Sequence, residues 1–141
     1  MKYIMIAIAV SLLGLGTACV NEGTPMVKTV SVDELNEIAS VQPEAIIIDV
    51  RSHAEYERVH AKPVKQVIIH TEMNRSLNLL PEDKATPVYL ICRSGIRSGT
   101  AGRVLVEHGY ANVYNVLGGT NDWVKKGFPV DSGRGVLDGG S

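Results

Sequence analysis

Short apolar runs recur along the middle of this chain, separated by segments with helical spacing. Residues 87–91 (Pro-Val-Tyr-Leu-Ile) have the length and the β-branched, apolar composition of a strand buried on both faces. Comparable runs occupy residues 27–30, 45–50, 67–69 and 113–116. Because strands that alternate with helices favour parallel pairing, we predict an α/β fold: a mostly parallel five-stranded sheet with helices on both faces.

Polar residues mark the ends of the predicted helices. Two capping boxes, each a serine followed three residues later by a glutamate, predict helix starts at Ser31/Glu34 and Ser52/Glu55. Another helix is predicted from about residue 72 to residue 80, where Pro81 ends it.

The last part of the chain changes from apolar to polar and glycine-rich. Thr120 is predicted to be the N-cap of a final helix, in which Trp123 is a core residue. Beyond Val130 the chain offers little apolar surface to bury. We therefore predict a folded domain over residues 27–130 and a flexible tail over residues 131–141.

The beginning of the chain has the pattern of a secretory signal peptide. Met1 and Lys2 precede an almost wholly apolar stretch over residues 4–15, and small residues follow up to Ala18. The apolar stretch is shorter than the about 20 residues that span a membrane. We therefore predict a signal peptide over residues 1–18 and export from the cytoplasm.

Cys19 directly follows the predicted cleavage position. Residues 15–19 (Leu-Gly-Thr-Ala-Cys) resemble a bacterial lipobox, in which the cysteine becomes the lipidated N-terminus of the mature protein. We expect lipidation, because a spare exposed thiol is a liability in an oxidising compartment. Ordinary cleavage after Ala18 is the alternative. By resemblance to sorting patterns, Val20 favours the outer membrane, so we expect a periplasmic protein with a lipid anchor at Cys19 and a tether over residues 19–26.

Composition limits the classes of function. The chain has 141 residues, which suits one domain. Lys and Arg number 14 against 15 Asp and Glu, so a nucleic-acid partner is not expected. The two cysteines, Cys19 and Cys92, form no Cys-x-x-Cys pair and no zinc-type spacing, so neither a metal site nor a cofactor is predicted.

Cys92 lies where the apolar run over residues 87–91 ends and a helical pattern begins. A cysteine at a helix N-terminus has a lowered pKa, because unpaired backbone amides and the helix dipole favour the thiolate. Arg93 and Arg97 add positive charge, and Gly95 permits the positive φ that a loop around an anion often needs. The loop from Cys92 to Ser98 is therefore the predicted active site, with Cys92 as the nucleophile.

Three segments together resemble a single rhodanese domain. They are residues 48–52 (Ile-Asp-Val-Arg-Ser) with Glu55 and Tyr56 close behind, residues 89–98 (Tyr-Leu-Ile-Cys-Arg-Ser-Gly-Ile-Arg-Ser), and residues 116–123 (Val-Leu-Gly-Gly-Thr-Asn-Asp-Trp). The exported single-domain form is similar to the small periplasmic rhodaneses of the phage-shock type. Residues 59–64 depart from the family pattern, in which only His60 matches cleanly.

The resemblance implies a rhodanese-like fold and a sulfurtransferase activity. Cys92 would take sulfane sulfur from thiosulfate or another donor as a persulfide, and pass it to cyanide or to a thiol. The resemblance makes Arg93 the donor contact, Arg97 a brace held by a carboxylate, and His60 a structural residue. The residues predicted to bind substrate are Arg93, Ser94, Gly95, Ile96, Arg97 and Ser98 of the loop, with Asp49 and Arg51 from the neighbouring strand. For Asp49 and Arg51 the alternative is a structural role, in which Arg51 pairs with an acid such as Glu55.

Three other functions share features of this loop. Phosphatases, including a related family with the rhodanese fold, and arsenate reductases use a cysteine and an arginine, but Cys92 and Arg97 enclose four residues, one fewer than a phosphatase loop. A membrane-tethered persulfide carrier with little turnover would have the same loop. A thiol-disulfide oxidoreductase is disfavoured, because no resolving cysteine lies near Cys92.

Overall fold

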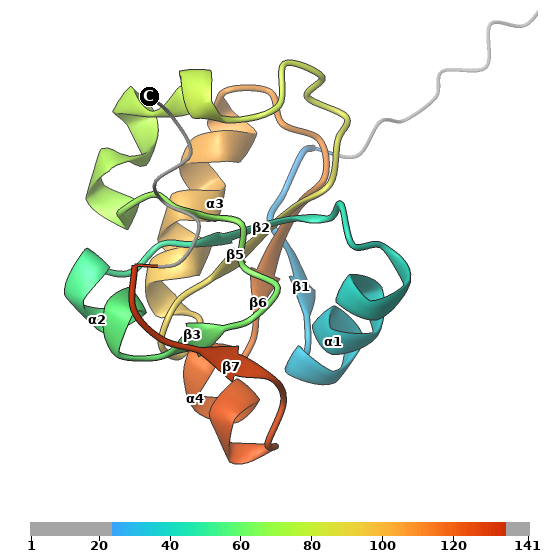
Figure 1. Cartoon of the computed structure of the whole chain (residues 1–141). Helices are drawn as coiled ribbons and strands as arrows, with labels where there is room; N and C mark the ends of the chain where they lie inside the picture. The colour runs from blue at the N-terminus through green and yellow to red at the C-terminus, as the bar shows by residue number, and fades with distance from the viewer. Residues whose placement is uncertain (1–23, 135–141) are drawn as a thin grey trace, which may run out of the picture.

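A five-stranded sheet forms the centre of the computed structural model, which describes residues 24–134. Its strands run in the order β1-β6-β5-β2-β4, and every neighbouring pair is parallel (Figure 1). They are β1 (Lys28–Val30), β2 (Ile46–Asp49), β4 (Gln66–Val67), β5 (Val88–Ile91) and β6 (Val113–Val116). The predicted α/β architecture with a parallel five-stranded sheet is confirmed.

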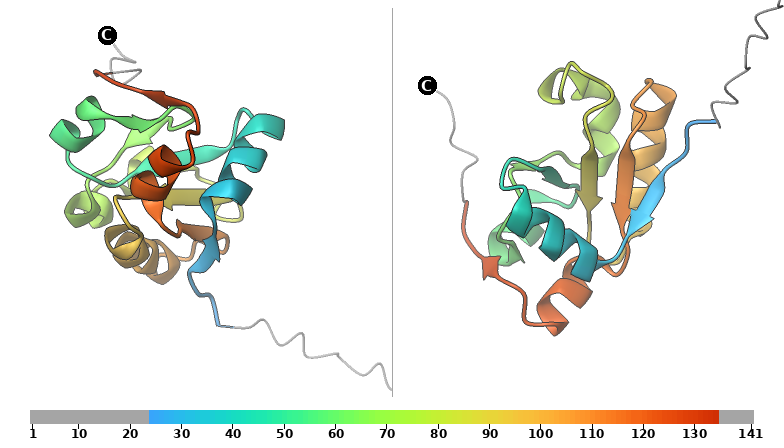
Figure 2. Two further views of the ribbon diagram at one scale, coloured as in Figure 1. Left: turned by 90° about the horizontal axis from the view of Figure 1, so that it is seen from below. Right: turned by 90° about the vertical axis from the view of Figure 1, so that its right-hand side faces the viewer.

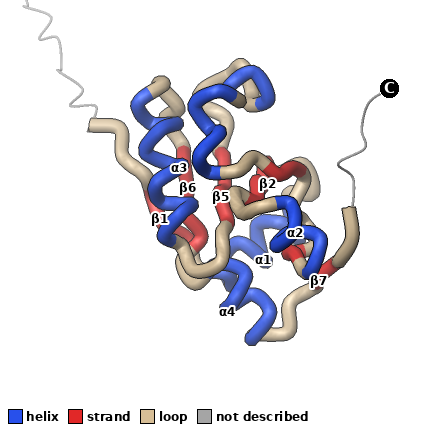
Figure 3. Tube along the Cα trace, turned by 90° about the vertical axis from the view of Figure 1, so that its left-hand side faces the viewer, coloured by secondary structure: helices blue, strands red, loops and turns tan. Residues whose placement is uncertain are grey.

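Helices cover both faces of this sheet. The helices α1 (Val32–Val41) and α3 (Ile96–Glu107) lie on opposite sides of it (Figures 1 and 3). The short helix α4 (Gly119–Lys125) packs in the same hydrophobic cluster as α1, and the 3₁₀ helix η1 (His70–Arg75) packs in the same cluster as α3. Side chains of β5 alternate between the two clusters, as a strand buried on both faces requires.

Both predicted capping boxes are present. The Ser31 side chain accepts a hydrogen bond from the Glu34 amide at the start of α1, and Ser52 accepts one from Glu55 at the start of α2 (His53–Arg58). Each glutamate carboxylate in turn accepts a hydrogen bond from the backbone amide of its serine. These helix starts depend only on residues within one turn, which explains why the sequence predicts them well.

The helix predicted over residues 72–80 is instead two 3₁₀ helices, η1 and η2 (Leu77–Leu79). Bonds between residues three apart close these turns, for example from the Ser76 amide to Met73 O at 3.1 Å. Met73 is buried against α3, while Ser76 and Asn78 alternate with leucines in the second half of the segment. Because asparagine and serine side chains compete for backbone hydrogen bonds, the segment does not continue as an α-helix.

The start of α4 also differs from the prediction. The N-cap is Gly118, with φ +77°, and not Thr120, which lies inside the helix. Thr120 donates from both its amide and its hydroxyl to Cys92 O, at 2.8 and 3.2 Å. In the right-hand view of Figure 2, α4 lies beyond the end of the sheet to which the β5 and β6 arrows point. Trp123 is fully buried, which confirms its place in the core.

The folded region continues past the predicted boundary at Val130. Strand β7 (Val130–Asp131) pairs antiparallel with β3 (His60–Ala61), and the Gly133 amide donates to Glu57 O at 2.7 Å. The predicted tail therefore begins too early: backbone pairing to a distant segment orders residues whose composition alone suggested flexibility.

Several predictions concern the ends of the chain. The signal peptide over residues 1–18, the lipidation of Cys19, most of the tether over residues 19–26, and residues 135–141 of the predicted tail lie outside the described residues. Within residues 24–134, the longest helices are too short or too polar to cross a membrane.

Candidate active site

Cys92 follows the last residue of β5, and the loop after it leads directly into α3. Gly95 is the N-cap of α3 and has φ +106°, the positive φ that the sequence predicted. The Cys92 side chain is only 1% exposed. Cys92, the predicted nucleophile, therefore lies at the base of the loop, at the carboxyl end of a central parallel strand, where ligands bind in open α/β sheets.

Hydrogen-bond donors of the loop converge on the Cys92 sulfur. The Gly95 amide lies 3.1 Å from Sγ, and the Ser98 hydroxyl lies 3.2 Å from it. Burial raises the pKa of the Cys92 thiol, but the hydrogen bonds from the side chain and amide of Ser98 and from the amides of Gly95 and Ser94 outweigh burial and lower it. The site thus favours a thiolate by fixed donors, as the loop sequence predicted.

The first turn of α4 is hydrogen-bonded to the start of the Cys92–Ser98 loop. Its amides donate to carbonyls of the loop: Thr120 to Cys92 O at 2.8 Å and Asn121 to Arg93 O at 3.1 Å. A Cβ atom at Gly119 would lie 2.3 Å from Cys92 O, so this close approach requires glycine. The Gly-Gly-Thr motif is therefore part of the candidate active site. The sequence predicted Thr120 as an N-cap and did not predict that it binds the backbone of the Cys92 loop.

Arg97 of α3 binds Glu55 of α2 and so braces the two helices against each other. Its guanidinium donates twice to the Glu55 carboxylate, at 2.8 Å for each bond. These bonds, together with the Ser52 cap and against a smaller effect of burial, lower the pKa of Glu55 to about 2. Glu55 thus serves both as a capping-box residue and as the carboxylate that holds the loop's second arginine.

Asp49 and Arg51 form a buried ion pair with each other. Arg51 Nη2 lies 2.6 Å from Asp49 Oδ2 and 2.8 Å from Val59 O, and Asp49 is 0% exposed. The alternative, structural role of this pair fits these contacts, but the acid that binds Arg51 is Asp49 and not Glu55, which binds Arg97. Asp49 was also predicted to bind substrate, but its enclosed carboxylate is engaged with Arg51. Arg51 does line the pocket described next.

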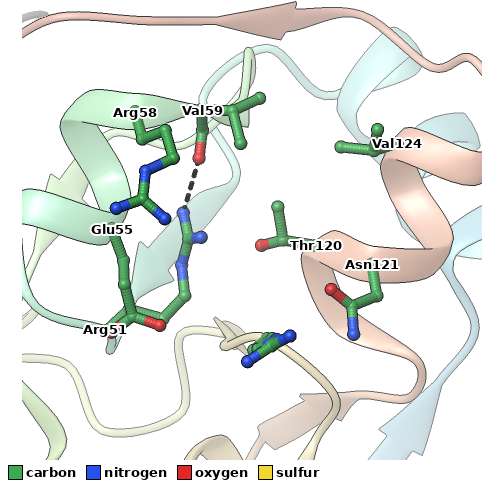
Figure 4. Close-up of a pocket in the computed structure, with 8 residues that line it drawn as sticks. Arg51, Glu55, Arg58, Val59, Thr120, Asn121 and Val124 are labelled. Carbon is green, nitrogen blue, oxygen red and sulfur yellow. Dashed lines mark hydrogen bonds between the residues drawn. The ribbon is translucent and has the colours of Figure 1, made fainter.

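A pocket of about 490 Å³ opens beside the loop, between α2 and α4 (Figure 4). Its lining residues are Arg51, Glu55, Arg58, Val59, Arg93, Thr120, Asn121 and Val124. Sequence reasoning named Arg51 and Arg93 but missed Arg58, Asn121 and Val124. Asn121 stands in the family-like segment over residues 116–123, and Arg58 precedes the segment that departs from the family pattern. Neither position shows that α2 and α4 face one pocket, because that depends on the tertiary structure.

Two loop residues predicted to bind substrate lie elsewhere. Ile96 is 79% exposed and does not line the pocket, and the Ser94 side chain is also exposed. Ser94 reaches the sulfur through its backbone amide. In such a loop the backbone does most of the binding, so the identity of these two side chains is a weak guide to their role.

His60 is a buried structural residue. Its Nδ1 lies 2.8 Å from Tyr56 O, and its ring stacks on the Tyr56 ring with centroids 3.7 Å apart. Across residues 24–134, the histidines, cysteine and acids nowhere gather in a group of three that suits a metal ion.

Comparisons with known proteins agree with this fold. The rhodanese-like domain family matches residues 31–126. The chain belongs to this family. The fold of a rhodanese-like domain from Anabaena is similar, with a TM-score of 0.67 at 19% identity, over 82% of this chain and 87% of that one. An E. coli rhodanese solved with anions has a TM-score of 0.54 at 28% identity, over 63% of this chain and 99% of that one.

Among characterised relatives, the tRNA uridine(34) hydroxylase of Hamiltonella defensa is 37% identical over 95 residues, which are 65% of this chain and 26% of that protein. The chain thus spans about a quarter of the length of this relative. Family membership supports a sulfurtransferase type of function, and the hydroxylase name belongs to proteins much longer than this one.

Proposed function

We propose that this protein is a sulfurtransferase that carries sulfane sulfur as a persulfide on Cys92. The observation that supports this most is the convergence of the Gly95 amide and the Ser98 hydroxyl on a buried Cys92 sulfur beside an open pocket. Such donors stabilise an anionic sulfur without reorganising during the reaction.

In the first step, the Cys92 thiolate attacks the outer sulfur of thiosulfate. A new S–S bond forms to Cys92, the S–S bond within thiosulfate breaks, and sulfite leaves with the electron pair. In the second step, cyanide or a thiolate attacks the outer sulfur of the persulfide, and the Cys92 thiolate is regenerated. No external oxidant or reductant is needed, because each step exchanges one sulfur bond for another.

The charges of the pocket suit an anionic donor. Arg58 and Arg93 line it, and no salt bridge engages either of them within residues 24–134. A volume of about 490 Å³ is far larger than thiosulfate needs and falls in the roughly 300–1,000 Å³ range of small-molecule sites. The proposed acceptor is therefore an organic thiol that shares the pocket, with cyanide as a laboratory substitute.

The test combines turnover with mass spectrometry. Wild-type protein treated with thiosulfate should gain the mass of one sulfur atom on the Cys92 peptide, and adding cyanide should release thiocyanate. Cys92→Ser should lose both signals, whereas Ser94→Ala, which keeps the loop amides, should retain them. Thiocyanate production by Cys92→Ser would overturn the covalent mechanism.

Two further outcomes separate the alternatives. A persulfide that forms but is not turned over would identify a sulfur carrier. Rapid hydrolysis of p-nitrophenyl phosphate, or reduction of arsenate, would overturn the assignment, although the four-residue spacing between Cys92 and Arg97 argues against both.

We also propose that the protein works in the periplasm, anchored through a lipid on Cys19. The apolar segment over residues 4–15 and the lipobox-like residues 15–19 support this. Mass spectrometry of the mature N-terminus should find a lipid on Cys19. An unmodified Cys19 at the N-terminus, as ordinary cleavage after Ala18 would leave it, or an intact Met1 would contradict the proposal.

A further inference from the structure

The Ser98 hydroxyl faces two acceptors with a single hydrogen. Its Oγ lies 3.2 Å from Cys92 Sγ and 2.6 Å from Asn115 Oδ1. A hydroxyl carries one O–H donor, so it cannot donate fully to both atoms at once. The shorter contact to the amide oxygen favours Asn115 while the sulfur is a neutral thiol.

The orientation of the Asn115 amide is determined by its other contact. Asn115 Nδ2 donates to Gly95 O at 2.9 Å, and a backbone carbonyl can only accept. Turning the amide over would place its oxygen against that carbonyl oxygen. The oxygen of Asn115 therefore faces Ser98, and it too can only accept a hydrogen bond.

Close packing reinforces this orientation. Asn115 is 8% exposed on β6, and α3 passes over it with Gly95 and Gly99. A Cβ atom at Gly99 would lie 3.2 Å from Asn115 Nδ2, tighter than ordinary contact. The absence of a side chain at Gly99 leaves room for the amide and little room for it to rotate.

We propose that Asn115 is a positioning residue that competes with the Cys92 sulfur for the hydroxyl hydrogen of Ser98. In the thiol state, Ser98 donates to Asn115, Asn115 donates to Gly95 O, and the thiol hydrogen is directed at Ser98 Oγ. When Cys92 ionises, the hydroxyl turns to the thiolate, because hydrogen bonds to a charged acceptor are stronger than those to an amide oxygen. Asn115 then loses that donor, so its presence opposes ionisation.

This inference rests on the proposed role of Cys92 as the reacting thiolate. The charged groups around the sulfur are Arg93 in the loop, Arg97 of α3 with its partner Glu55 of α2, and the Asp49–Arg51 pair at the end of β2. None of these side chains hydrogen-bonds to Asn115. A substitution at Asn115 therefore changes which atom accepts the hydrogen bond from Ser98 while leaving the surrounding charges in place.

The test is the pKa of Cys92, read from the pH dependence of iodoacetamide alkylation of the Cys92 peptide in the full chain. Asn115→Leu removes the competing acceptor, and the pKa should fall by about 0.5 to 1 unit, the equivalent of one neutral hydrogen bond. Asn112→Leu, a matched asparagine at the other end of β6, should leave the pKa unchanged.

A double-mutant cycle tests whether Asn115 acts on the pKa of Cys92 through the Ser98 hydroxyl. In a Ser98→Ala background there is no hydroxyl to compete for, so Asn115→Leu should no longer lower the pKa. If Asn115 only held the loop in shape, Asn115→Leu would instead disorder the donors and raise the pKa. A raised or unchanged pKa, or an equal fall in the Ser98→Ala background, would overturn the proposal.

Asn115→Val serves as the second variant, because a β-branched residue suits a strand if leucine is not accommodated. Circular dichroism checks that each variant is folded. Alkylation does not require sulfur transfer, so this result stands apart from the proposed function: a missing persulfide with the expected pKa shift would reject only the latter.

Discussion

The arginines around the pocket fall into two contrasting pairs. Arg51 and Arg97 are held by Asp49 and Glu55, whereas Arg58 and Arg93 have no acidic partner within residues 24–134. A guanidinium paired with a carboxylate has most of its hydrogen-bond donors occupied and holds neighbouring segments together. An unpaired one keeps its charge available to an anion. We therefore expect Arg51 and Arg97 to hold the structure around the site, and Arg58 and Arg93 to attract an anionic substrate.

The largest expected effect comes from breaking the buried pair. Asp49→Asn leaves the Arg51 guanidinium buried without its counter-charge, and we expect a loss of about 3 kcal/mol in the free energy of unfolding. Urea denaturation measures this loss. Asp33→Asn breaks an exposed pair with Lys126 and should cost less than about 0.5 kcal/mol. Equal losses in the two variants would mean that burial does not distinguish these pairs.

Breaking the half-exposed pair should have a smaller effect. Glu55→Gln preserves a side chain that can complete the capping box but removes the charge that binds Arg97. We expect a loss of about 1–2 kcal/mol in the free energy of unfolding, measured in urea. Glu57→Gln, on the same helix, breaks only the exposed contact with Arg134 and should be nearly neutral. A loss as large for Glu57→Gln would refute the bracing role of Glu55.

The same pair predicts how stability changes with pH. The pKa of Glu55 is about 2 in the folded protein and about 4.5 without its partners, so the unfolded state binds the proton first as the pH falls. The stabilisation by Glu55 is therefore complete above about pH 4.5 and is lost between about pH 4.5 and pH 2. Urea denaturation across this range should show the difference between wild type and Glu55→Gln shrinking toward zero. A difference that stays constant down to pH 2 would contradict this assignment.

The smallest effect on stability is expected at an unpaired arginine. Arg58→Gln should leave the free energy of unfolding within about 0.5 kcal/mol of wild type. It should raise the KM for thiosulfate about fivefold, the value of about 1 kcal/mol of exposed ionic interaction. Steady-state kinetics at low ionic strength measures this change, and added salt should reduce it.

Arg103→Gln is the control for Arg58, because Arg103 lies on α3 outside the pocket and bonds only to Thr100 among the described residues. Its KM should equal that of wild type. If both variants raised KM equally, general surface charge rather than the pocket would attract the donor.

The parts of this protein that the sequence alone determines are local. The strands of the five-stranded sheet coincide with or overlap short apolar runs, whereas β3 and β7 were not predicted. Both capping boxes involve residues within one helical turn. The left-handed Gly95 and the cysteine between strand and helix also need only neighbouring residues. For these features the nearest residues along the chain supply most of the energy that selects the conformation.

Only the tertiary structure decided which distant side chains meet. Arg97 and Glu55 are 42 positions apart, and Ser98 and Asn115 are 17 apart, yet both pairs form hydrogen bonds. Arg51 lies close in sequence to both Asp49 and Glu55, and in the fold it pairs with Asp49 while Arg97 of α3 pairs with Glu55. The pocket exists because α2 and α4 converge at one end of the sheet. The packing of helices on the sheet determines these partners. A charged or polar group buried there needs a hydrogen-bond partner, and only the fold brings one within reach.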